Sequence, residues 1–291
     1  MNGNPPLDPA YFSEEPWSVR VQRWLEDPTH ADTFLDSNMR LLRQIMEHRE
    51  SGLRVVVNIS AHALLAFLAE RRYRNLYEHP VIGGSRREPS PERMHVDQLL
   101  GFGAETEHYY FGAVALGGTG VRFYGEYCMV LQPDAVDGES QILDRDSYDL
   151  LVPPLSTVLP DVAAIVRMLR GRWGADAIDM LTLKLLPELR GTHRLITTGT
   201  VSEMILHDQE FVEAHLCLPD AFSPDRIQEV RHSPDEVAIE ANILARSAAG
   251  FPPTAIEIRW LSQREHVVRA LEAEGVDYRV VTLHGRGYQW R

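Results

Sequence analysis

Glu213 is the side chain in this sequence with the clearest potential for chemistry. It lies in the segment EFVEAHL, whose apolar residues predict a strand. The carboxylate either faces solvent or faces a cleft, where a fixed negative charge would stabilise positive charge that develops during a reaction. An E-x-E pair is absent, because Phe211 stands two residues before Glu213, and Glu210 falls on the opposite face of a strand.

A second group of candidates begins at the segment RFYGEYCMVL. Arg122 at its start carries a guanidinium group that could clamp phosphates, or it could pair with Glu126 or Asp146. Ser147 directly follows Asp146 and could cap a turn or orient a substrate hydroxyl group. No G-x-S-x-G segment surrounds Ser147, which disfavours a nucleophilic role. Gly125 would allow another part of the backbone to approach closely, so we interpret this segment as the frame of a pocket.

Other candidates stand at the ends of predicted strands. Asn58 and Ser60 end the segment VVVNIS and could bind a nucleoside, although Ser60 is also placed to cap the next helix. Tyr110 and Gly112 lie in YYFGAVAL, where an aromatic ring beside a glycine could stack on a base or pack in the core. Glu78 precedes a Gly-Gly turn and is a further candidate for binding.

Motifs for several other kinds of site are missing. No G-x-G-x-x-G follows a predicted strand, and G-x-x-x-x-G-K-[ST] does not occur, so Rossmann and P-loop nucleotide binding are poorly supported. H-E-x-x-H and C-x-x-C are also missing, so we expect no metal. Cys128 and Cys217 stand in apolar segments, which favours free thiols over a disulfide.

The composition narrows the class of partner. The chain has 291 residues and a net charge of −13, with 42 acidic and 29 basic side chains. Such a surface repels phosphates, so nucleic acid is an unlikely partner, and no apolar run is long enough to predict a membrane span. The N-terminal segment lacks the pattern of a cleavable signal peptide. We therefore expect a cytoplasmic protein, or one secreted into a host cell without such a signal.

The predicted elements divide the chain into four parts. We expect a flexible arm at 1–16, two helices within 17–52, a mixed core at 53–235, and an extension at 236–291 that contains a helix and then a strand, a helix and a strand. Within the core, 78–108 reads as an irregular loop, and YYFGAVAL and VRFYGEYCMVLQ read as strands joined by a GGTG hairpin turn. Helices are predicted at 157–172 and 175–189, strands in RLITTGTVSEMILHD and EFVEAHLCL, and a short helix in DAFSPDRIQEVRH.

Helices gather near the N-terminus and at 157–189, and strands fill most of the remaining core. This distribution predicts an α+β fold with a mostly antiparallel, split sheet, an N-terminal helical region and an inserted helical pair.

The order of the short motifs resembles a bacterial family of unknown function, domain of unknown function 3626. The resemblance covers roughly 53–235 and comprises, in order, VVVNIS, RRYRNLYE, a Gly-Gly-Ser turn, FGAVAL, RFYGEYCMVL, the pair Asp146-Ser147, and FVEAHL. Three positions depart from the family pattern: the Gly/Ser/Thr-rich turn is reduced to Gly83-Gly84-Ser85, Phe111 replaces a tyrosine, and Tyr124 is inserted.

By analogy, the layout also resembles that of ADP-ribosyltransferases, which have a split antiparallel sheet around an NAD cleft. In those enzymes an early strand supplies a polar or basic residue, a middle strand a serine or tyrosine, and a late strand a glutamate. The resemblance implies that Glu213 and Ser147 act on NAD, and that Arg122, Asn58, Ser60, Tyr110, Gly112, Asp146 and Glu78 bind it.

Three functional hypotheses follow. The first is an NAD-dependent ADP-ribosyltransferase-like toxin or effector that modifies a protein or nucleotide, with Glu213, Arg122 and Ser147 converging on one cleft. The second is an inactive scaffold that serves as a protein-interaction module, with the C-terminal strand, helix and strand predicted at 254–290 as its partner surface. The third is a metal-independent hydrolase that uses Asp146 and Glu213.

Overall fold

The computed structural model describes residues 13–29, 35–47, 52–75, 90–123, 125–151, 161–189, 195–206, 211–218 and 222–285. The α-helices of these ranges are α1 (Trp17–Glu26), α2 (Asp36–Glu47), α3 (Ala61–Glu70), α4 (Pro91–Leu100), α6 (Val162–Leu169), α7 (Trp173–Leu189), α8 (Thr198–Ile205), α9 (Pro234–Ala248) and α10 (Ala255–Glu274). The strands are β1 (Leu53–Ile59), β2 (Tyr109–Leu116), β3 (Gly120–Val121), β4 (Tyr127–Leu131), β5 (Gln141–Leu143), β6 (Arg170–Arg172), β7 (Glu213–Cys217), β8 (Ile227–His232), β9 (Asp277–Val280) and β10 (Leu283–His284).

An eight-stranded sheet of order β6-β5-β7-β2-β1-β4-β8-β9 organises these ranges. Its strand pairs are antiparallel except β8 with β9. The predicted α+β class and mostly antiparallel sheet are confirmed. Because β9 pairs with β8, the predicted C-terminal extension adds a strand to the same sheet as the predicted core.

The sheet divides between its two central strands. β1 pairs with β2 from Leu53–Leu116 to Val56–Ala113. Beyond Val56, β1 pairs with β4 on its other side, and β2 before Ala113 pairs with β7. The two strands thus part at Val56 and Ala113. The end of β1 and the start of β2 do not pair with each other, and side chains from both strands face the space between them.

Glycine is required beside this point. A Cβ atom on Gly112 would lie 2.8 Å from the carbonyl oxygen of Val56 and 2.7 Å from a methyl group of Val55. A side chain at position 112 would therefore force β1 and β2 apart one residue before their pairing begins.

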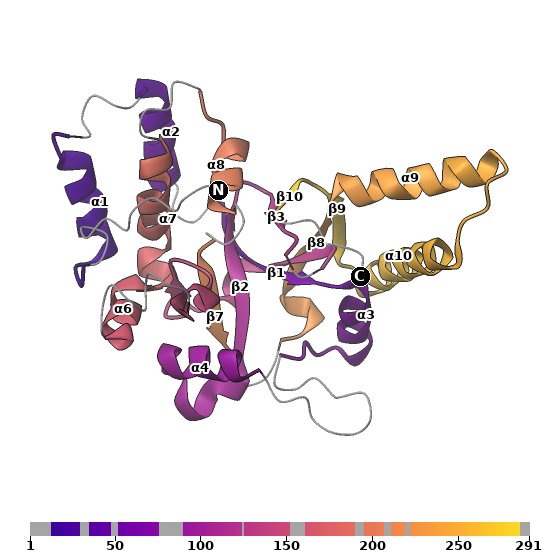
Figure 1. Ribbon diagram of the computed structural model, residues 1–291, viewed down its shortest axis with the longest axis horizontal. Helices are drawn as coiled ribbons and strands as arrows, with labels where there is room; N and C mark the ends of the chain where they lie inside the picture. Colours follow the sequence, from indigo (N-terminus) through magenta and orange to yellow (C-terminus); the bar gives the residue numbers. More distant parts are fainter. Residues whose placement is uncertain are drawn as a thin grey trace.

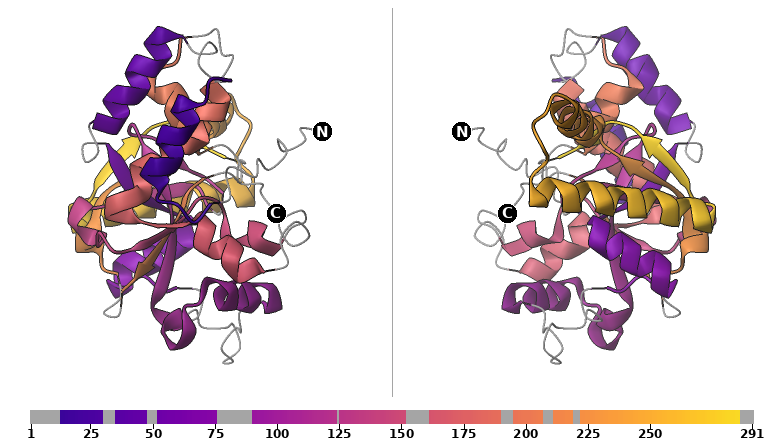
Figure 2. Two further views of the ribbon diagram at one scale, coloured as in Figure 1. Left: turned by 90° about the vertical axis from the view of Figure 1, so that its left-hand side faces the viewer. Right: turned by 90° about the vertical axis from the view of Figure 1, so that its right-hand side faces the viewer.

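Helices cover the sheet unevenly. Figures 1 and 2 show α1, α2 and α7 at one end of the sheet and α9 and α10 at the other. α7 packs against α1, α2 and α8, and α10 packs against α3. Most of α7 is buried, which makes it the central helix of its layer, and the predicted N-terminal helices and inserted helical pair are both present.

Several predicted elements were wrong. The segments joined by GGTG do not form a hairpin, because β1 lies between β2 and β4. The predicted loop 78–108 contains helix α4, the predicted strand before Glu213 contains helix α8, and the strand expected at the start of the tail belongs to α10. The short helix expected within 220–232 is, over the described residues, one 3₁₀ turn followed by strand β8.

Two further observations concern the described part of the chain. None of its helices combines the length and the apolar character that crossing a membrane requires. Neither Cys128, which is buried, nor Cys217, which is half-buried, belongs to a disulfide.

Candidate functional site

A cavity of about 290 Å³ opens where β1 and β2 separate. Residues of β1, β2, α4 and the segments before β7 and after β5 line it, and its charged lining residues are Arg74, Arg93, Asp146 and Glu213. Six aromatic side chains also line it: Tyr73, Tyr110, Phe111, Phe123, Tyr148 and Phe211. Opposite charges beside aromatic faces suit a ligand that has a flat ring and charged groups of both signs.

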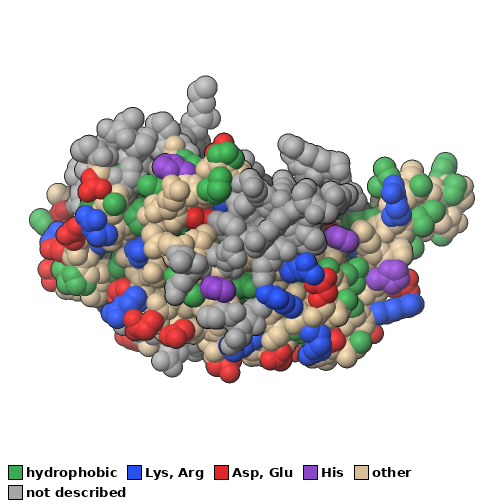
Figure 3. All heavy atoms as spheres, turned by 90° about the horizontal axis from the view of Figure 1, so that it is seen from below, with side chains coloured by type: hydrophobic (Ala, Val, Ile, Leu, Met, Phe, Trp, Pro, Cys, Tyr) green, Lys and Arg blue, Asp and Glu red, His purple; other side chains and the backbone are tan. Residues whose placement is uncertain are grey.

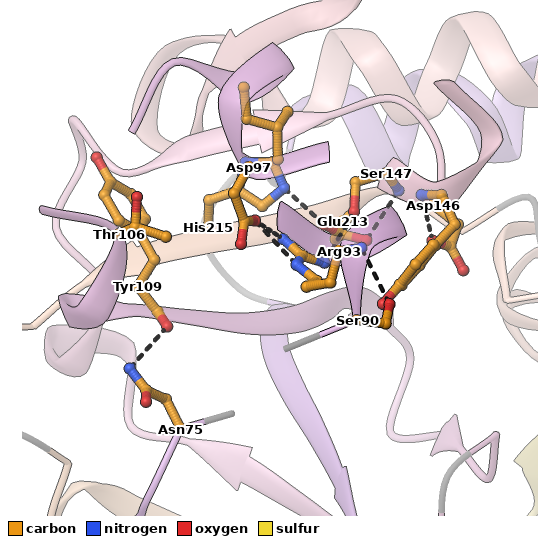
Figure 4. A network of polar contacts seen from close by, with 12 residues as sticks. Asn75, Ser90, Arg93, Asp97, Thr106, Tyr109, Asp146, Ser147, Glu213 and His215 are labelled. Carbon is orange, nitrogen blue, oxygen red and sulfur yellow. Dashed lines mark hydrogen bonds and ion pairs between the residues drawn. The ribbon is translucent and has the colours of Figure 1, made fainter. Parts of the chain in front are cut away.

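Glu213 lies on the cavity wall at the start of β7. Its register partner is Ala113, which pairs with Val56, so the carboxylate projects from the sheet beside the point of separation. The side chain is buried, and its Oε2 accepts a hydrogen bond from the backbone N–H of Ser147 at 3.0 Å. Its Oε1 lies 2.7 Å from Nε2 of His215. Figure 4 shows these contacts converging on the carboxylate from two sides.

These partners keep Glu213 ionised. Burial alone would raise the pKa of Glu213, but the hydrogen bond and charge of His215, the amide of Ser147 and the charge of Arg93 outweigh it and lower the pKa. The site therefore holds a fixed negative charge in a largely water-free setting, where electrostatic interactions are strong.

His215 belongs to the same face of β7, two residues after Glu213. Its ring is buried and meets the edges or faces of Phe102 and Phe111, each with a centroid separation of 5.3 Å. Its Nδ1 has no hydrogen-bond partner among the described residues. His215 thus holds the orientation of Glu213 rather than reaching the cavity itself.

Arg93 of α4 is the buried cation of the site. Its Nε donates to Oδ1 of Asp97 at 2.8 Å, and its Nη1 donates to Oγ of Ser147 at 3.4 Å. The guanidinium carbon lies 3.9 Å from the ring centroid of Phe111, within the range of a cation–π contact. Arg93 therefore links α4 to Phe111 of β2 and to Ser147, the residue whose backbone N–H donates to Glu213. Figure 4 shows Arg93 beside Ser147 and Glu213.

Asp146 contributes a second carboxylate to the cavity. Its Oδ1 accepts a hydrogen bond from the N–H of Tyr148 at 2.9 Å. Burial raises the pKa of Asp146 to about 6, and the negative charge of Glu213 adds to this shift. Two carboxyl groups whose pKa values are pushed in opposite directions are typical of acid–base sites.

Tyr110 and Gly112 of β2, two of the residues expected to bind a ligand, line the cavity. The ring of Tyr110 also packs against Tyr73 at a centroid separation of 5.8 Å. Burial, with a smaller contribution from Tyr110, raises the pKa of Tyr73 to about 12, so the Tyr73 hydroxyl group stays protonated at ordinary pH.

Asn58 lines the cavity as well, but its amide nitrogen has a structural task. Nδ2 lies 2.9 Å from each of the carbonyl oxygens of Val121, Gly125 and Tyr127. Ser60 does not line the cavity, and its hydroxyl group caps α3 by accepting from the N–H of Ala63 at 3.3 Å.

Ser147 and Arg122 take different places from those expected. The Ser147 side chain is fully buried behind the wall, and its contribution is the backbone N–H that holds Glu213. Arg122 lies outside the cavity lining and pairs with Asp235 at 2.7 Å, so the expected partners Glu126 and Asp146 were wrong. Arg122 is therefore not placed to clamp a ligand in this cavity.

Glu78 lies outside the described residues. Within the described ranges, no group of three or more His, Cys, Asp or Glu side chains is arranged to hold a metal ion.

Arg93, His215 and Arg74 are the site residues that sequence reasoning missed. Ser90-Pro91 is the helix-start signal that would have found α4, and the two-residue spacing from Glu213 would have found His215.

Comparisons with protein-family models, with curated proteins and with solved structures find no match to this chain. The resemblance to domain of unknown function 3626 therefore stays a prediction.

Proposed function

We propose that this chain is an NAD-dependent transferase of the ADP-ribosyl type, which modifies a protein or nucleotide target. The observation that carries this proposal is the position of Glu213: an ionised, doubly hydrogen-bonded carboxylate on the wall of an aromatic cavity where a split sheet separates. The same cavity receives Asn58 from an early strand, Tyr110 from a middle strand and Glu213 from a late strand, the order expected from the analogy.

The proposed reaction breaks the N-glycosidic bond between C1′ of the ribose and the ring nitrogen of nicotinamide. The electron pair of this bond leaves with nicotinamide, whose ring becomes neutral, and C1′ becomes oxocarbenium-like. Glu213 stabilises that positive charge, which is larger on the sugar in the transition state than in bound NAD. A nucleophile of the target then bonds to C1′ and loses its proton.

The cavity suits the nicotinamide-ribose end of NAD. Its volume of about 290 Å³ lies at the small end of the range for ligand pockets. Tyr110 and Phe111 offer aromatic surfaces for the flat nicotinamide ring. Among the described lining residues, Arg74 is the arginine best placed to contact the diphosphate, since its ion pair with Glu70 at 2.7 Å is partly exposed and exchangeable.

Asp146 favours a second candidate, in which water is the acceptor and the chain hydrolyses the same bond. A carboxyl group with its pKa raised to about 6 is ionised in most molecules at neutral pH and can accept the proton of an attacking water. Release of nicotinamide without a target would indicate this activity.

The test is calorimetric titration with NAD, together with measurement of nicotinamide release. We expect micromolar binding that Arg74→Ala weakens by about 1.5–3 kcal/mol, the range for a hydrogen bond to a charged group. Arg122→Ala is the matched control, because Arg122 lies outside the cavity, and it should bind NAD like the wild type. A folded wild-type sample that binds neither NAD nor a related dinucleotide would overturn the proposal and leave the interaction scaffold in its place.

A further inference from the structure

Helix α9 projects from the body of the protein. Figure 1 shows α9 extending beyond the sheet, and Figure 3 shows hydrophobic side chains gathered on the projecting end that α9 and α10 form. Only Glu236 and Ile243 of this helix are buried. Glu240 lies on the same side and pairs with Arg264 of α10 at 2.6 Å, so this line of residues faces α10.

A second line of α9 consists of apolar residues and is exposed. Val237, Ala241, Leu244 and Ala248 follow one another at spacings of four, three and four residues, the repeat of a helix–helix seam. Val237 is 37% exposed and Leu244 is 54% exposed, and both alanines are exposed. We call these four residues the α9 seam.

The α9 seam is complementary to itself. When two copies of α9 pack antiparallel about a two-fold axis between Ala241 and Leu244, Val237 faces Ala248 of the other copy, and Ala241 faces Leu244. Every layer then sets a large side chain against a small one, which is how facing positions of a packed helix pair interdigitate. A two-fold interface requires this kind of self-complementarity.

The α9 seam carries no charge of its own that would oppose a second copy. The chain carries a net charge of −13, so most surfaces of two copies repel each other. Ala238 and Ala245 flank the α9 seam, and none of these six residues is charged. On the other side Glu240 borders the seam, three residues after Val237 and four before Leu244, and its charge is paired with Arg264 at 2.6 Å. The face therefore presents uncharged or paired side chains to a second copy.

We propose that the chain forms a two-fold dimer through the α9 seam, with the two α9 helices antiparallel. The proposal does not depend on the function of the cavity, because α9 contributes no residue to its lining.

Sedimentation over a range of concentrations tests the dimer. The wild type should sediment as two chains of 33.0 kDa each, and Leu244→Glu should weaken the association at least about 100-fold, because two charges would be buried at the centre of the interface. Ile239→Glu is the matched control: Ile239 is 39% exposed on the same helix but away from the seam, and this variant should remain dimeric.

A pair of compensating changes tests the antiparallel register. Ala241→Leu sets leucine against leucine, and Leu244→Ala sets alanine against alanine, so each change alone should weaken the dimer about 10-fold or more. The double variant restores one large and one small side chain in each layer and should associate within about threefold of the wild type. Alanine and leucine both favour helix, so α9 itself should persist in all three variants, as circular dichroism would show.

Three results would overturn the proposal. A wild type that stays monomeric at the highest concentration reached would exclude the second copy as the occupant of the seam. An unchanged dimer in Leu244→Glu would place the interface elsewhere, and a double variant as weak as either single variant would exclude the two-fold register.

Discussion

Replacement of Glu213 by glutamine removes the charge of the site while nearly preserving its shape. The backbone N–H of Ser147, 3.0 Å from Oε2, has to keep an oxygen acceptor, so the glutamine oxygen should face Ser147. The new amide group then faces Nε2 of His215, where Oε1 now lies at 2.7 Å. His215 can accept this hydrogen bond if its proton moves to Nδ1.

The magnitudes follow from these contacts. Two charge-assisted hydrogen bonds become neutral ones, and the His215 proton moves to a nitrogen without a described partner. Removal of the buried charge offsets part of this loss, so folding should lose only about 1 kcal/mol. That loss corresponds to a fall in Tm of about 2–4 °C. By contrast, the transition state loses its fixed countercharge. Loss of one preorganised electrostatic group costs about 10²–10³-fold in kcat, or about 2.7–4 kcal/mol.

The assay is nicotinamide release from NAD by folded wild type and Glu213→Gln, with thermal denaturation on the same samples. Glu229→Gln is the matched control. Like Glu213, Glu229 is buried on a strand and has a cationic partner, in this case Arg231, but it does not line the cavity. We expect Glu229→Gln to lose stability and to keep its rate per folded molecule. If Glu213→Gln released nicotinamide within about threefold of the wild-type rate, the electrostatic role of Glu213 would be refuted.

Three further predictions concern stability and can be checked by urea denaturation. Burial raises the pKa of Asp146 from 3.8 to about 6, so its contribution to stability is greatest below pH 3.8 and is lost as the pH rises through 6. Asp146→Asn should therefore stabilise the protein at pH 8 by up to about 3 kcal/mol. A gain of the same size at pH 4 would contradict this cause. Gly112→Ala should cost about 1–3 kcal/mol, because its Cβ meets the Val56 carbonyl oxygen at 2.8 Å, and a neutral effect would show that β1 and β2 separate freely. Ser60→Ala should lower the free energy of unfolding by about 1 kcal/mol through loss of the α3 cap, whereas Ser60→Gly should lower it by only a few tenths of a kcal/mol.

The sequence allowed the fold class to be predicted, because β1 and β2 are mostly apolar runs, β7 lies within the strand-like segment EFVEAHL, and most helices show clear periodicity. The errors arose where two local signals competed. The segment TAIEIRW contains residues that favour strands, but Thr254 and Glu257 form a capping box that starts α10. The Gly117-Gly118 pair suggested a hairpin, whereas β1, more than 50 residues earlier, supplies the actual partner of both neighbouring strands.

The predicted site residues Glu213 and Tyr110, which line the cavity, project from strands, whereas residues whose place depends on distant packing could not be predicted. Glu213 and Tyr110 could be proposed because strand alternation and residue type are visible in the sequence. The choice between Arg122 and Arg93 could not be made in this way. Arg122 is directed to Asp235, and Arg93 enters the site only because α4 packs beside the segment that contains Ser147.

The segment that contains Gly125 has a role at the cavity edge that is structural. The described residues between β3 and β4, 122–123 and 125–126, pass the end of β1, where Nδ2 of Asn58 lies 2.9 Å from each of the carbonyl oxygens of Val121, Gly125 and Tyr127. A Cβ atom on Gly125 would overlap the backbone of Ile59, so the connection can lie against β1 only with glycine at this position. Asn58 therefore holds the β3–β4 connection against the end of β1, in the part of β1 that does not pair with β2. The split in the sheet explains the polar residue near the end of β1, and the same split gives Glu213 its access to the cavity.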